Sequence, residues 1–148
     1  MDRIFRVIIE RCVACGKCEL ACAFAHGEEG RPGPSRIRIH RRGPDLGTPV
    51  VCLQCDQAGC KAACPVDAIR WNDTTGALEV SADRCIRCRS CVAACPFGNI
   101  AWDEGRRRVE KCDLCGGDPR CVPFCPTRAL EYVPAGRAAT RPEDMVVR

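Results

Sequence analysis

The cysteines of this chain fall into four groups of four, and none is left outside them. In every group two residues separate the first two cysteines and three residues separate the last two. Three of the groups end in Cys-Pro. The groups are Cys12, Cys15, Cys18 and Cys22; Cys52, Cys55, Cys60 and Cys64; Cys85, Cys88, Cys91 and Cys95; and Cys112, Cys115, Cys121 and Cys125. No other feature of the sequence constrains the fold as strongly.

This spacing is typical of cubane [4Fe–4S] clusters, which take three thiolates from one tight loop and a fourth from elsewhere. Four groups predict four clusters and, in a chain of 148 residues, a relay for electrons. Zinc is the main alternative because C-x2-C pairs also bind zinc, but closely spaced triplets followed by C-x3-C-P are not zinc spacing. A catalytic cysteine is disfavoured because every cysteine belongs to a group.

The cysteine content, about a tenth of the residues, would by itself also suit a disulfide-rich scaffold. The N-terminus MDRIFRVIIERC lacks the apolar region of a signal peptide. No apolar stretch is long enough to span a bilayer, so we expect no membrane span. A reducing, cytoplasmic setting fits best, and there a thiol-rich chain more often binds metal.

The formal charge of +4 counts every cysteine as neutral. Each oxidised cubane with its four thiolates adds roughly −2, so the loaded protein would carry about −4. We therefore interpret the many arginines as compensation for buried negative charge, and we expect no nucleic-acid partner. The runs Arg41-Arg42 and Arg106–Arg108 are either solvated faces or docking surface, and we favour the first.

An internal repeat follows three of the groups. Cys64–Trp71, Cys95–Trp102 and Cys125–Tyr132 share a pattern in which the fifth residue after the cysteine is aliphatic and the seventh is aromatic. A period of two indicates a strand with both side chains on one face. The C-x3-C segments indicate short helices, and proline ends them. Each unit therefore predicts a cysteine loop, a short helix and a short strand.

Other segments predict strands, loops and one longer helix. A hairpin is expected from Ala68–Trp71 and Ala77–Ser81. We expect strands at Ile4–Ile9, Ile37–Ile39 and Arg107–Glu110, loops at Gly27–Pro34 and Arg42–Pro49, and a loosely held tail after Pro134. Ala23 replaces the proline after the first group, so that helix should continue through His26. His26 and His40 are either extra ligands or proton carriers, or polar groups of loops and helix ends, which we favour.

These motifs resemble the four-cluster iron–sulfur subunits grouped with the electron-transfer subunit of dimethyl sulfoxide reductase. The resemblance extends from Arg3 to about Tyr132. The cysteine spacings, Cys-Asp-Leu-Cys at Cys112–Cys115 and Cys-Pro-Thr-Arg-Ala-Leu at Cys125–Leu130 carry it. Cys15–Cys22, with His26 and Ser35–Ile39, is similar to the small subunits of tungsten aldehyde oxidoreductases and of carbon monoxide dehydrogenase ferredoxins.

The resemblance implies a nested ligation and an α+β fold of two bacterial-ferredoxin-like modules around four [4Fe–4S] clusters. The implied ligand sets are Cys12, Cys15, Cys18 and Cys125; Cys112, Cys115, Cys121 and Cys22; Cys52, Cys55, Cys60 and Cys95; and Cys85, Cys88, Cys91 and Cys64. The outer module would comprise residues 1–49 and 103–148, and the inner module residues 50–102. We expect the outer clusters near both ends of the relay.

The expected function is electron transfer without catalysis, because no dinucleotide fingerprint, P-loop or catalytic triad spacing is present. The expected partner is a large catalytic subunit, with a tungsten- or molybdenum-pterin aldehyde oxidoreductase as the first expectation and a flavoprotein or ferredoxin as acceptor. The alternatives are a ferredoxin subunit of a carbon monoxide dehydrogenase, hydrogenase or formate dehydrogenase, a free polyferredoxin, and a scaffold for cluster assembly. Copies stacked end to end could conduct between protomers.

Basic residues in or beside the cysteine loops should raise the potential of the nearest cluster, because positive charge favours the added electron. These residues are Lys17, Lys61, Arg87, Arg89 and Lys111. Sequence proximity alone suggests them.

Overall fold

The computed structural model describes residues 3–135, in which short strands and helices form a small α+β fold. The eight strands pair into four two-stranded antiparallel sheets. In chain order the elements are β1 (Arg3–Val7), η1 (Ile9–Arg11), α1 (Lys17–Ala25), β2 (Arg38–Gly43), β3 (Leu46–Val50), α2 (Gly59–Ala62), β4 (Ile69–Asn72), β5 (Ala77–Val80), α3 (Ser90–Ala94), β6 (Ile100–Asp103), β7 (Arg108–Lys111), η2 (Leu114–Gly117) and β8 (Leu130–Pro134). Within this described part, no helix is both long and apolar enough to cross a membrane.

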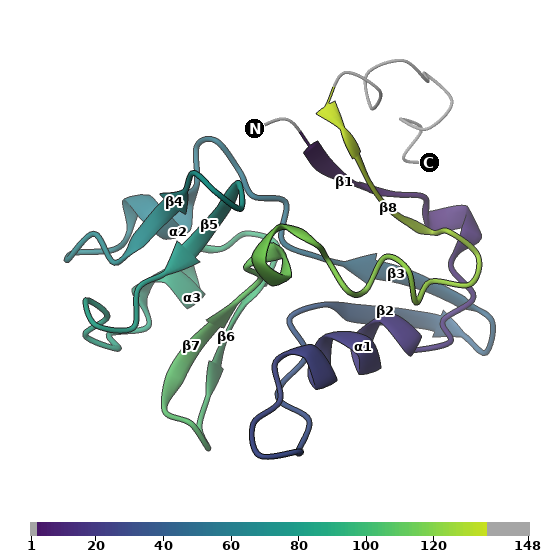
Figure 1. Cartoon of the computed structure of the whole chain (residues 1–148), viewed down its shortest axis with the longest axis horizontal. Helices are drawn as coiled ribbons and strands as arrows, with labels where there is room; N and C mark the ends of the chain where they lie inside the picture. Colours follow the sequence, from purple (N-terminus) through teal and green to yellow (C-terminus); the bar gives the residue numbers. More distant parts are fainter. Residues whose placement is uncertain (1–2, 136–148) are drawn as a thin grey trace.

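The two ends of the described chain meet in one sheet. β1 pairs with β8, and the register runs from Arg3 opposite Pro134 to Val7 opposite Leu130. Figure 1 shows this pair beside β2, β3 and α1, while β4, β5, α2 and α3 form a second group. The β6–β7 hairpin extends between the two groups (Figure 1). The first and last cysteine groups are therefore neighbours in space although they are far apart in sequence.

The strands of the predicted repeat are confirmed by burial and by strand positions. Its short helices are found in two units, as α2 and α3, but the prediction of a helix in the last unit is wrong, because residues 121–124 form turns. β4, β6 and β8 begin at Ile69, Ile100 and Leu130, which are the aliphatic positions of the pattern, and all three side chains are buried. The aromatic positions are partly buried: two tryptophans pack on one apolar core, and the Tyr132 ring lies 5.5 Å from that of Phe5. Period two in the sequence thus corresponds to one buried face of each strand.

The buried side chains form two separate apolar cores. The first contains Ile37, Ile39 and Leu130 together with cysteines of the chain ends. The second contains Ile69, Leu78 and Ile100 with cysteines of the middle segment. Two residues cross the module boundaries expected from the sequence, because Val51 packs in the first core and Val109 in the second. Small cores of this kind leave much of the stability to the groups that the cysteines bind.

The prediction of a loop at Arg42–Pro49 is wrong, because β2 and β3 pair there as a hairpin from Arg38–Val50 to Gly43–Leu46. The buried positions of β3 are Gly47 and Pro49, two residues that rarely indicate a strand. Glycine is required at position 47, since a Cβ there would lie 2.6 Å from Cγ2 of Ile39.

The remaining boundary differences are small. The first strand ends at Val7, and the chain continues as the 3-10 helix η1 rather than as strand to Ile9. The predicted 37–39 strand begins at Arg38 and runs to Gly43. The helix that carries Cys18 and Cys22, α1, is expected from the sequence to continue through His26. It ends at Ala25, and His26 is its C-cap. Of the tail expected to be loosely held, residues 136–148 lie outside the described part.

Candidate metal centres

The four C-x2-C loops share an unusual backbone conformation. In each loop the residue before the second cysteine has a positive φ, between 50° and 63°. These residues are Ala14, Gln54, Arg87 and Leu114. The left-handed region costs a residue with a side chain roughly 1–2 kcal/mol. The same strain at the same place in four loops indicates that their shape serves a common binding role.

The last cysteine of each sequence group accepts a hydrogen bond from a backbone N–H. The donors are Arg36 to Cys22 at 3.2 Å, Ala68 to Cys64 at 3.2 Å, Asn99 to Cys95 at 3.4 Å and Ala129 to Cys125 at 3.2 Å. In the three Cys-Pro repeats the donor lies four residues after the cysteine. Bonds of this kind stabilise a thiolate and help to set the potential of a bound iron–sulfur cluster.

Two cavities are each lined by four cysteines. Site C is lined by Cys52, Cys55, Cys60 and Cys95, and site D by Cys64, Cys85, Cys88 and Cys91. In both sites three cysteines come from one loop and the fourth from the end of another group. Site C has a volume of about 100 Å³. Exposed apolar side chains border both cavities, among them Phe97 at site C and Ile86 at site D.

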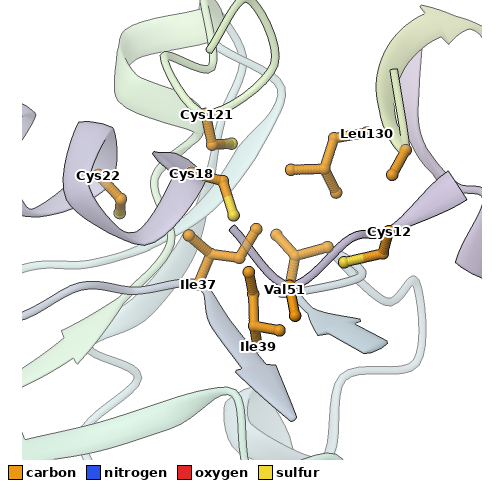
Figure 2. Close-up of a cluster of buried hydrophobic side chains, with 10 residues drawn as sticks. Cys12, Cys18, Cys22, Ile37, Ile39, Val51, Cys121 and Leu130 are labelled. Carbon is orange, nitrogen blue, oxygen red and sulfur yellow. The ribbon is translucent and has the colours of Figure 1, made fainter. Parts of the chain in front are cut away.

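The cysteines of the two chain ends gather around the first core. We call site A the place where Cys18 interacts electrostatically with Cys12 and Cys125, and we assign Cys15 of the same C-x2-C loop to it. Site B is the place where Cys121 interacts with Cys22, Cys112 and Cys115. In Figure 2, Cys12 and Cys18 flank an aliphatic group that includes Ile37 and Val51. Burial raises the pKa of Cys18 to about 12, and the nearby thiolates of Cys125 and Cys12 act in the same direction. Site A therefore brings together thiols from the first and last groups.

Site B shows the same electrostatic pattern. Burial raises the pKa of Cys121, and the thiolates of Cys112, Cys22 and Cys115 raise it further. Burial also acts to raise the pKa of Cys22, but hydrogen bonds from His26 and the Arg36 amide outweigh it, so that the pKa of Cys22 lies below its ordinary value. Cys121 thus resists ionisation in a crowded group of thiols. A bound cation would stabilise the thiolate forms of such a group.

The four sites follow one another through pairs of neighbouring cysteines. Cys18 of site A acts electrostatically on Cys121 of site B, and Cys52 of site C acts on Cys112 of site B. Cys60 of site C acts on Cys91 of site D. These interactions make A and B, B and C, and C and D neighbours, which supports the order A, B, C, D.

Charged residues form a network beside site B. His26 Nε2 lies 3.0 Å from Oδ1 of Asp113, and its Nδ1 lies 2.9 Å from the Cys22 carbonyl oxygen. Hydrogen bonding to Asp113, and then to Cys115 and Cys22, raises the pKa of His26 to about 12. The Arg36 guanidinium binds both Asp113 and Glu110. His26 lies at the end of α1, as expected from the sequence, and its ring lies with Asp113 and Cys115 in a group whose ligand atoms are within 4.8 Å of one another, so the alternative role as an extra ligand stays a prediction.

The residues present fit iron–sulfur clusters. All sixteen cysteines are free thiols, and soft thiolates in fours suit either zinc or an iron–sulfur cluster. At sites C and D three of the four cysteines come from one loop, an arrangement typical of a cluster rather than of the paired C-x2-C ligands of zinc. Backbone N–H donors to sulfur and apolar surroundings complete an environment suited to a cluster.

Sequence proximity is only a partial guide to the residues around the sites. Of the five basic residues predicted to lie near clusters, only Lys111 is buried. Lys17, Lys61, Arg87 and Arg89 are exposed, although Arg87 and Arg89 line the site D cavity. Sequence reasoning missed Arg36, Gln54 and Asp113, and the only available signal was that the last two lie inside C-x2-C loops.

Comparisons with known proteins agree with this chemistry. Residues 46–134 match a family described as a 4Fe-4S dicluster domain, and residues 9–25 match a 4Fe-4S binding domain. The aliphatic sulfonate oxidoreductase, polyferredoxin-like subunit, of Pyrococcus furiosus is 38% identical over 125 residues, which cover 84% of this chain and 72% of that protein. Electron transport protein HydN of Escherichia coli is 33% identical, with 88% of this chain and 87% of HydN covered.

A solved structure resembles the fold. The active site complex BamBC of benzoyl coenzyme A reductase, with benzoyl-CoA, contains a chain with a TM-score of 0.51 and 21% identity, covering 89% of this chain and 79% of that one. At this identity the likeness concerns the fold alone. The family match spans more than half of the sequence, and sequence relatives cover most of it. The chain therefore belongs to the 4Fe-4S dicluster domain family.

Proposed function

We propose that the chain is a non-catalytic electron-transfer subunit that holds one [4Fe–4S] cluster in each of sites A to D. The proposed ligands are the four cysteines by which each site was defined. A cluster, when bound, supplies one-electron redox chemistry. The chain itself contributes the thiolates, the backbone donors to sulfur and the apolar cover. The proposed membership of the dimethyl sulfoxide reductase iron–sulfur subunit group rests on the cysteine spacings.

The order of the sites is the observation that carries this proposal. Sites A and D are the ends of the series, and each contains one exposed cysteine, Cys15 in A and Cys88 in D. Electrons could thus enter at one exposed end and leave at the other. This order differs from the sequence expectation of outer-module sites at both ends, because Cys52 of the inner segment neighbours Cys112 of the outer one.

We propose the two-module division on the same basis, with sites A and B in the outer module and sites C and D in the inner one. The two apolar cores support this division, since the first contains cysteines of A and B and the second those of C and D. Val51 and Val109 pack across the boundary, so the modules share side chains at their junction. The proposed reducing, cytoplasmic location rests on the sixteen free thiols.

The proposed partner is a large catalytic oxidoreductase subunit, with a tungsten- or molybdenum-pterin aldehyde oxidoreductase as the first candidate. The relative in Pyrococcus furiosus, named a subunit of a sulfonate oxidoreductase, supports the role of an accessory subunit. HydN, named an electron transport protein, favours the second candidate, a free polyferredoxin that serves several enzymes.

Anaerobic purification of the native chain distinguishes these candidates. Iron and sulfide should each be near sixteen per chain, as four cubanes require. Mass spectrometry should identify one large oxidoreductase subunit that co-purifies in fixed ratio, and its substrate should reduce the bound clusters. Isolation as a monomer that accepts electrons from unrelated enzymes would favour the free polyferredoxin. Zinc in place of iron and sulfide would contradict both.

A further inference from the structure

Lys111 is a buried lysine at the junction between sites B and C. It ends β7 and directly precedes Cys112 of site B, and only 5% of its surface is exposed. Its ammonium group also reaches the loop of site C, where Nζ donates to Sγ of Cys52 at 3.3 Å. One side chain therefore touches the sulfur of one site and adjoins the backbone of the next.

The ammonium group has three acceptors for its three donors. Besides Cys52 Sγ, it donates to Oε1 of Gln54 at 3.0 Å and to the carbonyl oxygen of Cys112 at 3.5 Å. Gln54 is itself buried, and its amide group donates to the same Cys112 carbonyl at 3.0 Å. The Leu78 N–H donates to Gln54 Oε1 at 2.9 Å. These contacts hold the charge in a fixed position between the two sites.

Lys111 has no carboxylate partner among residues 3–135, although Glu110 precedes it. The Glu110 carboxylate forms ion pairs with two arginines, Arg36 at 2.9 Å and Arg108 at 2.6 Å. A buried charge is costly unless an opposite charge or several hydrogen bonds compensate it. Within the described residues, the thiol that the ammonium group contacts is Cys52 of site C, at 3.3 Å.

We propose that Lys111 is a positioning residue for electron transfer, whose fixed positive charge raises the reduction potential of the site C cluster most, that of site B less, and those of sites A and D little. The inference rests on the proposed function, since it assumes clusters in these sites. Positive charge stabilises the more negative, reduced form of a cluster, and the effect weakens with distance and with exposure to water. An electron would then be favoured in the middle of the series.

The test is a redox titration of the loaded protein, followed anaerobically by electron paramagnetic resonance. Lys111→Met keeps the length of the side chain and removes its charge. At the wild-type midpoint potential of the affected cluster, the ratio of reduced to oxidised cluster in Lys111→Met should be at least tenfold lower than in wild type. A tenfold change corresponds to a shift of about 59 mV in the midpoint of a one-electron couple. Lys61→Met is the matched control, because Lys61 adjoins Cys60 of the same site but is exposed. There the ratio should change less than twofold.

Iron and sulfide counts show whether the variants keep their clusters. If Lys111→Met keeps all of its iron and shifts no midpoint more than the control does, the proposal is wrong. If this variant loses iron, Lys111→Gln decides, because it removes the charge but keeps an N–H group that can donate to Cys52 Sγ. A fall of at least threefold in the same ratio would support the proposal, and an unchanged ratio would overturn it. The proposed function fails separately, through wild-type protein that holds clusters but exchanges no electrons with a partner.

Discussion

Arg36→Met should strongly shorten the lifetime of the folded, loaded protein. The Arg36 side chain is 13% exposed and binds Glu110, whose side chain is 3% exposed, at 2.9 Å and Asp113 at 2.6 Å. Removing one partner of a buried ion pair costs about 3–5 kcal/mol. We expect the lower end, about 3 kcal/mol, because Arg108 still pairs with Glu110 and His26 with Asp113. This corresponds to roughly a 100-fold change in an equilibrium or rate.

The assay is the rate at which the visible absorbance of the clusters bleaches in urea without oxygen. A rate is the appropriate quantity, because cluster loss makes unfolding irreversible. Urea is preferred to guanidinium because it does not screen charges. Arg38→Met is the control, since Arg38 is an exposed residue of β2 only two positions away. Its rate should stay within about twofold of wild type, and Arg36→Met should bleach between about 10 and 100 times faster. Equal rates for the two variants would refute the reasoning.

Three further substitutions test other parts of the structure. Gly47→Ala should speed bleaching by the equivalent of about 1–3 kcal/mol, because the new Cβ would lie 2.6 Å from Ile39 and 3.1 Å from Ala14 Cβ in the site A loop. Leu78→Ala removes a fully buried side chain of the second core and should cost about 2–5 kcal/mol, seen as earlier bleaching in a urea series. Arg87→Glu should change the reduced-to-oxidised ratio of any cluster less than about threefold in a redox titration, since Arg87, although it lines the site D cavity, is exposed and water screens its charge; a larger change would mean that its charge acts on site D despite this exposure.

The parts of the fold that the sequence predicts well are those with a short-range signal. The Cys-Pro repeat places β4, β6 and β8 because a two-residue period and a proline break act over fewer than ten residues. The β2–β3 hairpin has no such signal. Its inward positions are Gly47 and Pro49, and glycine is needed at position 47 because a Cβ there would meet Ile39 of β2 and Ala14 of the site A loop. Part of that requirement comes from a loop more than thirty residues away, which no local pattern records.

The metal sites likewise have features that the sequence predicts from a short-range signal and features that it does not predict. Spacing identifies the cysteines, because three thiols in one loop already define most of a cluster site. It does not reveal which charged residues act on them. Lys111 and Arg87 look alike in sequence, each beside a ligand cysteine, yet one is buried against Cys52 Sγ and the other is exposed. The difference arises from how β7 packs between the two cores, and packing is a property of the whole fold.

The polar contacts between sites B and C hold these two sites in place relative to one another. Each apolar core is small, and four C-x2-C loops hold a strained residue, so the empty protein has little to keep it folded. Buried Gln54 and Lys111 connect the loops of sites B and C, and Arg36 connects Glu110 of β7 to Asp113. These contacts are directional, whereas apolar packing tolerates sliding. They therefore fix the separation of neighbouring sites, and a relay in which electrons pass between those sites depends on that separation.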